Sequence, residues 1–221
     1  MGALSARLET LFRKQLGETD GTELHTVLGT EVMTLSGGDV VSVAPQTSVG
    51  VGAKAGGSAV TVVETGDGAI HRTTLTLTSL SVTMTDATTN GCHGTVKLYD
   101  FPEGAIQILG GSMNLTTLAG SGGIADGAAL VGGLGTSAIG TNNATLTSTE
   151  QDLLSSTAGT LTAGAGTLKK YSSLIATAYD GTATPVDAIL NIAVPDADSS
   201  ASDTVAVSGT IILIWANLGD Y

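Results

Sequence analysis

From Glu23 onward, apolar residues recur at every second position rather than at the spacing of a helix. A period of two places successive side chains on opposite faces of a β-strand, so that one face can be buried. The clearest example is residues 74–85, whose apolar side chains change parity half-way: Leu75 and Leu77, then Leu80, Val82 and Met84. One extra residue near Thr78 and Ser79 is needed to keep all of them inward, which predicts a β-bulge or a bend there.

Three further segments have the alternation or the boundaries of strands. Residues 95–109 contain a turn signal at 102–104, where proline presets its backbone angle and glycine eases the exit, and this predicts a β-hairpin. Residues 186–194 alternate and end at Pro195, which predicts an antiparallel strand buried chiefly on one face. Residues 204–216 begin with alternation and become apolar on both faces, as expected of a strand in the middle of a sheet.

The remaining composition favours the same class of fold. Residues 118–140 consist mainly of small side chains, and either a long surface loop or several short strands fits them. The chain has 31 glycines and 3% aromatic residues, and it shows no strong helical period beyond its first residues. Alternation of helices and strands is therefore disfavoured. We expect residues 21–221 to form an all-β domain, an antiparallel β-sandwich of jelly-roll type.

The first residues differ from those that follow. Apolar side chains fall at helical spacing before Gly17, a residue that favours the end of a helix. Residues 1–16 hold three basic and one acidic side chain, whereas the rest of the chain holds five basic and nineteen acidic ones. Residues 1–20 are therefore predicted to be a short amphipathic helical arm, which packs on its own domain or docks in a groove of a neighbouring subunit. The docking interpretation assigns these residues to partner binding: Leu4, Arg7, Leu8, Leu11, Phe12, Arg13, Lys14 and Leu16.

Charge and hydropathy disfavour several classes of protein. With 20 acidic and 8 basic side chains the formal net charge is −12, whereas nucleic-acid binding requires a surplus of Lys and Arg to neutralise phosphates. The longest apolar run, residues 211–216, is far shorter than the roughly 20 residues of a membrane-spanning helix. Charges among the N-terminal apolar positions disfavour a secretory signal. Cys92 is the single cysteine, so no disulfide can form within the chain.

Candidate catalytic and metal-ligating residues are few. Of His25, His71 and His93, only His93 has another soft ligand beside it, Cys92, whereas metal sites usually show paired ligands at fixed spacing. Adjacent residues on a strand point to opposite faces, so Cys92 and His93 are not expected to act as a catalytic pair. Neither a metal site nor a catalytic dyad is predicted here.

Two further patterns resemble binding motifs without completing them. Residues 50–56 contain glycines spaced somewhat like a dinucleotide fingerprint, but a Thr-rich, strand-like stretch follows where that motif requires a helix. Asp196, Asp198 and Asp203 start like a calcium loop, but the sixth and twelfth positions lack the required Gly and Glu, so that only binding through these side chains stays open. We therefore expect no cofactor and no enzymatic activity.

Three segments resemble virion structural proteins of tailed bacteriophages: residues 71–86 (HRTTLTLTSLSVTMTD), 91–110 (GCHGTVKLYDFPEGAIQILG) and 209–221 (GTIILIWANLGDY). The resemblance covers most of the chain after the arm. It implies a decoration, or cement, subunit that coats the capsid, often as a trimer with a β-sandwich or jelly-roll core. Major capsid proteins of these phages carry a long spine helix, and no helical pattern of that length exists in this sequence.

The predicted function is therefore that of a virion structural protein on the capsid surface. It decorates and stabilises the capsid as a homotrimer bound to the major capsid protein, without nucleic acid or a membrane as a partner. Two alternatives stay open. One is a component of the tail or of the head–tail connector. The other is a host-recognition or carbohydrate-binding module, for which the available aromatic side chains are Trp215, Tyr99, Tyr171, Tyr179 and Tyr221.

Overall fold

The computed structural model describes residues 23–25, 31–36, 39–43, 52–66, 70–87, 91–124, 127–140, 145–161, 167–172, 177–195, 197–199 and 203–219. The chain divides into two compact units, Met1–Thr47 and Ser48–Tyr221. In the first unit, β1 (Glu23–His25), β2 (Glu31–Ser36) and β3 (Asp39–Val43) form a three-stranded antiparallel sheet. The sequence assigned these strands to the same domain as the later ones. The predicted helical arm, residues 1–20, and all its predicted contact residues lie outside the described residues.

The second unit is built on one large antiparallel sheet of eleven strands. Its strands are β4 (Ala53–Lys54), β5 (Val60–Gly66), β6 (Ile70–Asp86), β7 (Cys92–Asp100), β8 (Gly104–Gly120), β9 (Ala129–Gly135), β10 (Leu154–Thr160), β11 (Leu168–Ser172), β12 (Thr177–Gly181), β13 (Asp187–Val194) and β14 (Thr204–Gly219). Two short 3-10 turns, η1 (Gly57–Ala59) and η2 (Ser148–Glu150), complete the described elements. The prediction of an all-β antiparallel fold is confirmed.

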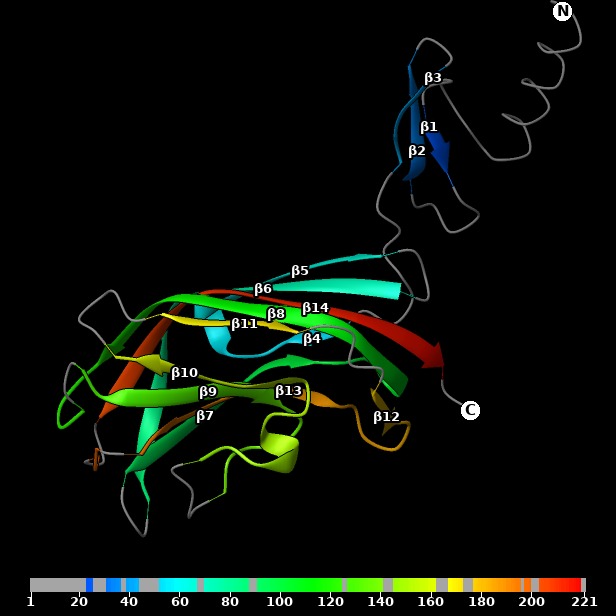
Figure 1. The fold of residues 1–221 in the computed structure, drawn as a ribbon. Helices are drawn as coiled ribbons and strands as arrows, with labels where there is room; N and C mark the ends of the chain where they lie inside the picture. The colour runs from blue at the N-terminus through cyan, green and yellow to red at the C-terminus, as the bar shows by residue number, and fades with distance from the viewer. Residues whose placement is uncertain are drawn as a thin grey trace, which may run out of the picture. The chain divides into compact units, whose positions relative to one another are not determined.

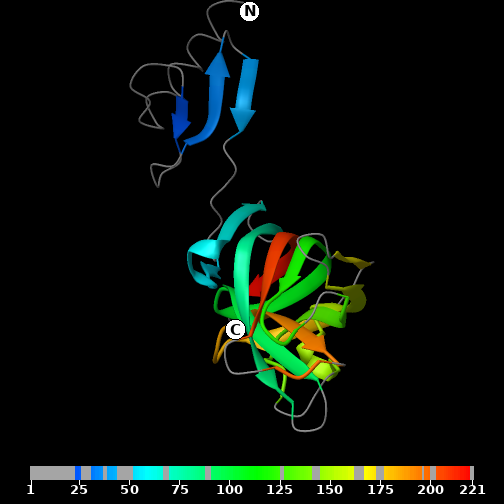
Figure 2. The ribbon, with the colours of Figure 1, turned by 90° about the vertical axis from the view of Figure 1, so that its left-hand side faces the viewer.

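The sheet has barrel-like curvature. Its strand order is β10-β9-β13-β7-β6-β14-β8-β11, with β5 added to β6, β4 to β7 and β12 to β8. The strands β10 and β11, at opposite ends of that order, lie side by side, and Thr157 Oγ1 donates a hydrogen bond to the Lys169 carbonyl at 3.3 Å. Figure 1 shows β5, β6, β14 and β8 in one layer and β9, β13 and β7 in the facing one, and Figure 2 shows the same strands curling round a common interior.

One continuous core fills the space between these layers. It contains buried side chains from β5 to β14, and its largest members are aromatic: Trp215, Tyr99 and Phe101. The Phe101 ring meets the rings of Tyr99 and Trp215 edge-on, with centroids 5.1 Å and 5.2 Å apart. No helix in the described part of the chain is long and apolar enough to cross a membrane.

The predicted irregularity in residues 74–85 is confirmed as a bulge in β6. In the pairing with β14, Leu80 faces Val207 and Leu77 faces Gly209, so Thr78 and Ser79 together face one residue. Ser79 has a positive φ of 46°, and its N–H donates to Ser208 Oγ at 2.8 Å. The extra residue restores the parity, and the apolar side chains of residues 74–85 are buried on both sides of it.

The last strand lies in the middle of the sheet, as predicted. β14 pairs with β6 along one edge and with β8 along the other. Its inward row is fully buried and contributes five residues to the core: Val205, Val207, Ile211, Leu213 and Trp215.

The predicted hairpin of residues 95–109 is wrong. β7 pairs with β13, β6 and β4, whereas β8 pairs with β14, β11 and β12. Residues 101–103 carry the chain across the core from one layer to the other, and the Phe101 N–H donates to the Val186 carbonyl at 2.9 Å. A Pro-Gly turn signal marks where the chain reverses, but it does not decide whether the two strands pair or face each other across a core.

β13 is antiparallel and ends before Pro195, as predicted, but it is buried on both faces rather than chiefly on one. Residues 136–140 and 145–150 cover its outer face, where Ile139 and Leu146 pack on Ala193. Asn191, fully buried, accepts a hydrogen bond from the Ile139 N–H at 3.1 Å and donates to the carbonyls of Ser137 and Glu150, each at 2.8 Å. Residues 118–140 contain the end of β8, one strand, β9, and connecting residues, so neither one long loop nor several short strands describes this stretch.

Candidate functional site

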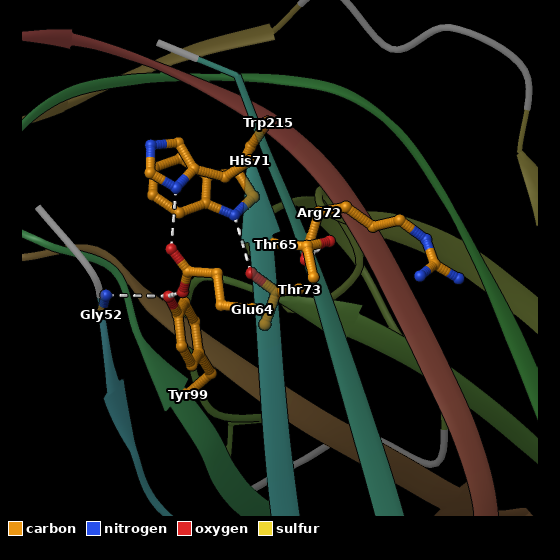
Figure 3. A network of polar contacts seen from close by, with 8 residues as sticks. All are labelled: Gly52, Glu64, Thr65, His71, Arg72, Thr73, Tyr99 and Trp215. Atoms are coloured by element: carbon orange, nitrogen blue, oxygen red, sulfur yellow. Dashed lines mark hydrogen bonds and ion pairs between the residues drawn. The ribbon is translucent and has the colours of Figure 1, made fainter. Parts of the chain in front are cut away.

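The sheet places a row of polar side chains inside the domain at one end of β6. His71 and Thr73 have the same parity as Leu75, so they continue the inward row of that strand. In the pairing with β14, His71 lies opposite Trp215. The two rings stack with centroids 4.1 Å apart and planes 11° from parallel, and Trp215 Nε1 donates to Thr73 Oγ1 at 2.9 Å (Figure 3).

Glu64 joins this row from the neighbouring strand. It has the inward parity of β5, and its Oε1 lies 2.7 Å from His71 Nδ1. Its other oxygen, Oε2, accepts a hydrogen bond from the Tyr99 hydroxyl, which in turn accepts one from the Gly52 N–H at 2.9 Å (Figure 3). The side chains of Glu64 and His71 are 6% and 0% exposed. We call Gly52, Glu64, His71, Tyr99, Thr73 and Trp215 the inner network.

The inner network links two strands of the curved sheet that do not pair with each other. β5 pairs with the first half of β6, while β7 pairs with its last residues, so the two strands flank β6 on the same side without pairing with each other. Glu64 from β5 and Tyr99 from β7 meet across that gap, and Gly52 ties the chain leading into β4 to the same point. Burial and the neighbouring Glu64 raise the pKa of Tyr99, so its hydroxyl stays a hydrogen-bond donor.

Chemically, the inner network resembles a proton-transfer relay, but it is enclosed. A carboxylate, an imidazole and a phenol in contact are a set that general acid–base catalysis uses. All three side chains are almost completely buried, however. A hollow of about 330 Å³ lies beside one end of the network, and its lining includes Ile70, Arg72 and Ile214 on the outer side of the sheet as well as His71 itself. Arg72 points away from the network (Figure 3).

The outer face of the same three strands exposes apolar side chains. Val63 on β5, Ile70 on β6 and Ile214 on β14 are 56%, 50% and 39% exposed. The strand register places Ile214 opposite Arg72, which lies opposite Thr65, so these side chains form adjacent rows. We call Val63, Thr65, Ile70, Arg72 and Ile214 the outer patch. Large apolar side chains gathered on one sheet face indicate a contact surface more readily than single exposed ones do.

Comparison with known proteins gave no match. No family model matches the chain, and neither does a curated protein or a solved structure.

Cys92 and His93 point to opposite faces of β7, as expected. Cys92 belongs to the main core, whereas His93 lies opposite Ala193 on the outer face, near Glu150. Burial, followed by the nearby Asp86 carboxylate, raises the pKa of the Cys92 thiol to about 11. Burial also lowers the pKa of His93, while Glu150 acts in the opposite direction. The third histidine, His25, lies in β1.

The aspartates that start like a calcium loop bind backbone amides instead. Asp198 Oδ1 accepts a hydrogen bond from the Gly91 N–H at 3.0 Å, and Asp203 Oδ2 accepts one from the Gly123 N–H at 3.1 Å. Asp196 lies outside the described residues. Within the described ranges, no group of three or more His, Cys, Asp or Glu side chains could hold a metal ion. These carboxylates therefore anchor the connections around β14.

The glycine-rich stretch that resembles a dinucleotide fingerprint leads into η1 and β5, not into a long helix. Gly52 acts through its N–H in the inner network, and a Cβ at this position would lie 2.2 Å from the Asp100 carbonyl. Gly56 has a positive φ of 77° at the start of η1. Both positions therefore need glycine because of the local backbone conformation and packing.

Sequence reasoning missed the inner network. The signal was present in part, because His71 shares the parity of Leu75, and Glu64 shares that of Val60 and Val62. The alignment of β5 with β6 and the approach of Tyr99 from β7 come from pairings between distant segments, and no local pattern contains them.

Proposed function

We propose that the protein is a structural subunit of a tailed-bacteriophage virion, which decorates and stabilises the capsid by contacts between its own copies and with the major capsid protein. The observation that carries the proposal is the outer patch, in which three exposed apolar side chains lie around Thr65 and Arg72 on a sheet that the core and the inner network hold firmly. Such a face binds by burying surface, without a chemical step.

The side chains that general acid–base chemistry would use support a binding role rather than a catalytic one. Glu64, His71 and Tyr99 bind one another inside the domain, and their side chains are almost completely buried even though His71 borders a hollow at the end of the network. Their positions join β5, β6 and β7, which is a structural task. We therefore assign the protein no enzymatic activity.

The assignment to a virion rests on the resemblance of three segments to phage structural proteins. In this chain the segments coincide with β6, with β7 and the start of β8, and with the second half of β14. These are framework strands, as expected if the shared feature is a rigid β subunit. We propose that the two layers form a jelly-roll-type sandwich and that three copies assemble into a homotrimer on the capsid surface.

Residues 1–16 are proposed to clasp the neighbouring subunit or the capsid. Their apolar stripe, which includes Leu8 and Leu11, is flanked by basic side chains, and the rest of the chain is strongly acidic. An apolar stripe supplies buried area, whereas the basic side chains orient the contact and make it sensitive to salt. Repetition over a lattice multiplies such weak contacts.

Imaging of intact particles tests the location. Gold-labelled antibody raised against the purified protein should spread over the capsids of phage particles from the source culture. Label confined to one vertex or to the tail would instead indicate a connector or tail component, and particles without label would overturn the virion assignment.

A double substitution tests whether residues 1–16 make this contact. The variant Leu8→Asp with Leu11→Asp should no longer co-sediment with particles that lack the protein, whereas Thr10→Asp, which adds a charge off the apolar stripe, should bind like the natural chain. Circular dichroism should show the same β content for all three proteins. If the double variant still saturates the particles, residues 1–16 do not hold the protein on the capsid.

One observation favours the carbohydrate-binding alternative. Tyr171 on β11 is 74% exposed, which suits stacking on a sugar ring. Of the other candidates, Trp215 and Tyr99 are buried, the Tyr179 hydroxyl donates to the Asp152 carbonyl at 3.0 Å, and Tyr221 lies outside the described residues. A glycan-array signal that disappears in Tyr171→Ala would support this alternative, and no signal in the natural protein would remove it.

A further inference from the structure

The strand β5 has one free edge. It pairs with β6 from Val60 to Gly66 in a single register without a shift, and no strand of the described part of the chain pairs with its other side. Figure 1 shows β5 outermost beside β6. An unpaired edge offers a row of backbone N–H and C=O groups to any strand that approaches in the right orientation.

β5 lacks the features by which proteins usually protect such an edge. Its sequence, VTVVETG, contains no Lys or Pro, and its regular register contains no bulge. Its one charged residue, Glu64, points inward, which on an edge strand normally opposes pairing. Here both carboxylate oxygens already bind His71 and Tyr99, and the side chain is 6% exposed, so a second strand would remove almost no further water from it.

The outward side chains of β5 are self-complementary. They are Thr61, Val63 and Thr65, and all three are exposed. If two copies pair antiparallel about Val63, Val63 of one copy faces Val63 of the other, and Thr61 of each faces Thr65 of the other. Pairs of β-branched side chains directly opposite each other stabilise a sheet, and no like charges meet on this face.

We propose that the free edge of β5 is a two-fold interface that pairs antiparallel with β5 of a second copy of this chain. The pairing joins two sheets into one and makes the outer patches of both copies continuous. A two-fold axis requires the same surface on both partners, and the pattern centred on Val63 meets that requirement. The inference does not depend on the virion assignment, since it concerns copies of this chain alone.

The pairing has a distinctive dependence on salt. Each chain carries a formal net charge of −12, so two copies repel at low ionic strength. The contact itself contains no exposed charge on β5, so salt screens the repulsion without weakening the interface. Dimers of the full chain should therefore become more stable as salt is added, whereas a contact held by ion pairs would weaken.

Sedimentation of the full chain over a range of concentrations tests the interface. In solution, away from the capsid on which the homotrimer is proposed to assemble, the natural protein should form dimers. Val63→Lys, which places two ammonium groups face to face, should raise the dimer dissociation constant roughly tenfold or more. The matched control is Thr76→Lys, on the same outer face but opposite Thr61 on the paired strand β6. It should leave the dissociation constant close to that of the natural protein.

A crosslinking experiment tests the register. Val63→Cys should give a disulfide-linked dimer on mild oxidation with copper phenanthroline, whereas Thr76→Cys should not, and the natural Cys92 is buried and does not compete. A natural chain that stays monomeric at the highest concentration would overturn the proposal. So would a dimer that Val63→Lys leaves intact, or crosslinking as efficient at position 76 as at position 63.

Discussion

Replacing Glu64 by alanine should destabilise the second unit far more than replacing an exposed residue of the same strand. Glu64 is the shared acceptor at the seam between β5 and β7: one oxygen lies 2.7 Å from His71 Nδ1, and the other accepts the Tyr99 hydroxyl. The substitution removes both contacts at once. It leaves a phenol that still accepts the Gly52 N–H but has lost the acceptor for its own proton.

The size of the effect follows from burial. Removing a nearly buried acceptor costs about 1–3 kcal/mol for each buried polar group that loses its hydrogen bond to it, and Glu64 has two such contacts. Glu64→Gln should cost only about 1 kcal/mol, since the amide has the same shape and still offers one acceptor oxygen and an NH2 group. His71→Ala combined with Glu64→Ala should cost less than the sum of the two single changes, because each removes the other's partner.

Urea unfolding followed by the fluorescence of Trp215 is a suitable assay, since this is the single tryptophan and it stacks on His71. Thr65→Ala on the exposed face of β5 is the control and should change the free energy of unfolding by less than about 0.5 kcal/mol. The reasoning is refuted if Glu64→Ala unfolds within about 1 kcal/mol of the natural protein, or if Glu64→Gln is as damaging as Glu64→Ala.

Three further predictions concern the other buried polar groups. Asn191→Ala should lower the free energy of unfolding by about 3 kcal/mol, because three hydrogen bonds to residues 137–150 are lost. The amides of residues 137–150 should then undergo hydrogen exchange before those of the rest of the sheet, and unchanged exchange there would contradict the prediction. Cys92 should not react with iodoacetamide at pH 8 until urea is added, since a pKa of about 11 leaves about one thousandth of the thiol ionised; rapid labelling of the folded protein would show otherwise. Because the pKa of His93 is lowered in the folded protein, the unfolded chain binds a proton at His93 more readily than the folded one. The folded state is therefore not penalised above the ordinary pKa of 6.5, and it loses stability relative to the unfolded chain as the pH falls below that value. His93→Gln should therefore lose less stability than the natural protein between about pH 8 and about pH 5, and equal losses in the two proteins would count against it.

Local patterns predicted the features that local sterics decide. The bulge at Ser79 could be predicted because the apolar positions change from odd to even numbers half-way through one strand. Only an extra residue keeps the apolar side chains of both halves inward. The central place of β14 was readable because its second half is apolar at successive positions. The end of β13 was readable because Pro195 follows it.

Local sequence patterns did not predict which distant segments pair with each other. The turn at 102–104 fixes a reversal, yet β7 and β8 lie in different layers because each pairs with a strand from a distant part of the chain, β7 with β13 and β8 with β14. Likewise, the outer face of β13 looks half polar in sequence because it includes Asn191. That side chain is buried because a segment more than forty residues earlier lies over it and takes all its hydrogen bonds.

The inner network and the free edge of β5 are two consequences of one side chain. A glutamate in the middle of an otherwise uncharged edge strand would usually be interpreted as protection against pairing. Its parity turns it inward, and there His71 and Tyr99 bind both carboxylate oxygens. The charge therefore holds β5 on the domain and is absent from the surface that a second copy would meet. Glu64→Gln should thus leave dimer formation intact while weakening the domain, whereas Val63→Lys should weaken the dimer and leave the free energy of unfolding of the monomer nearly unchanged.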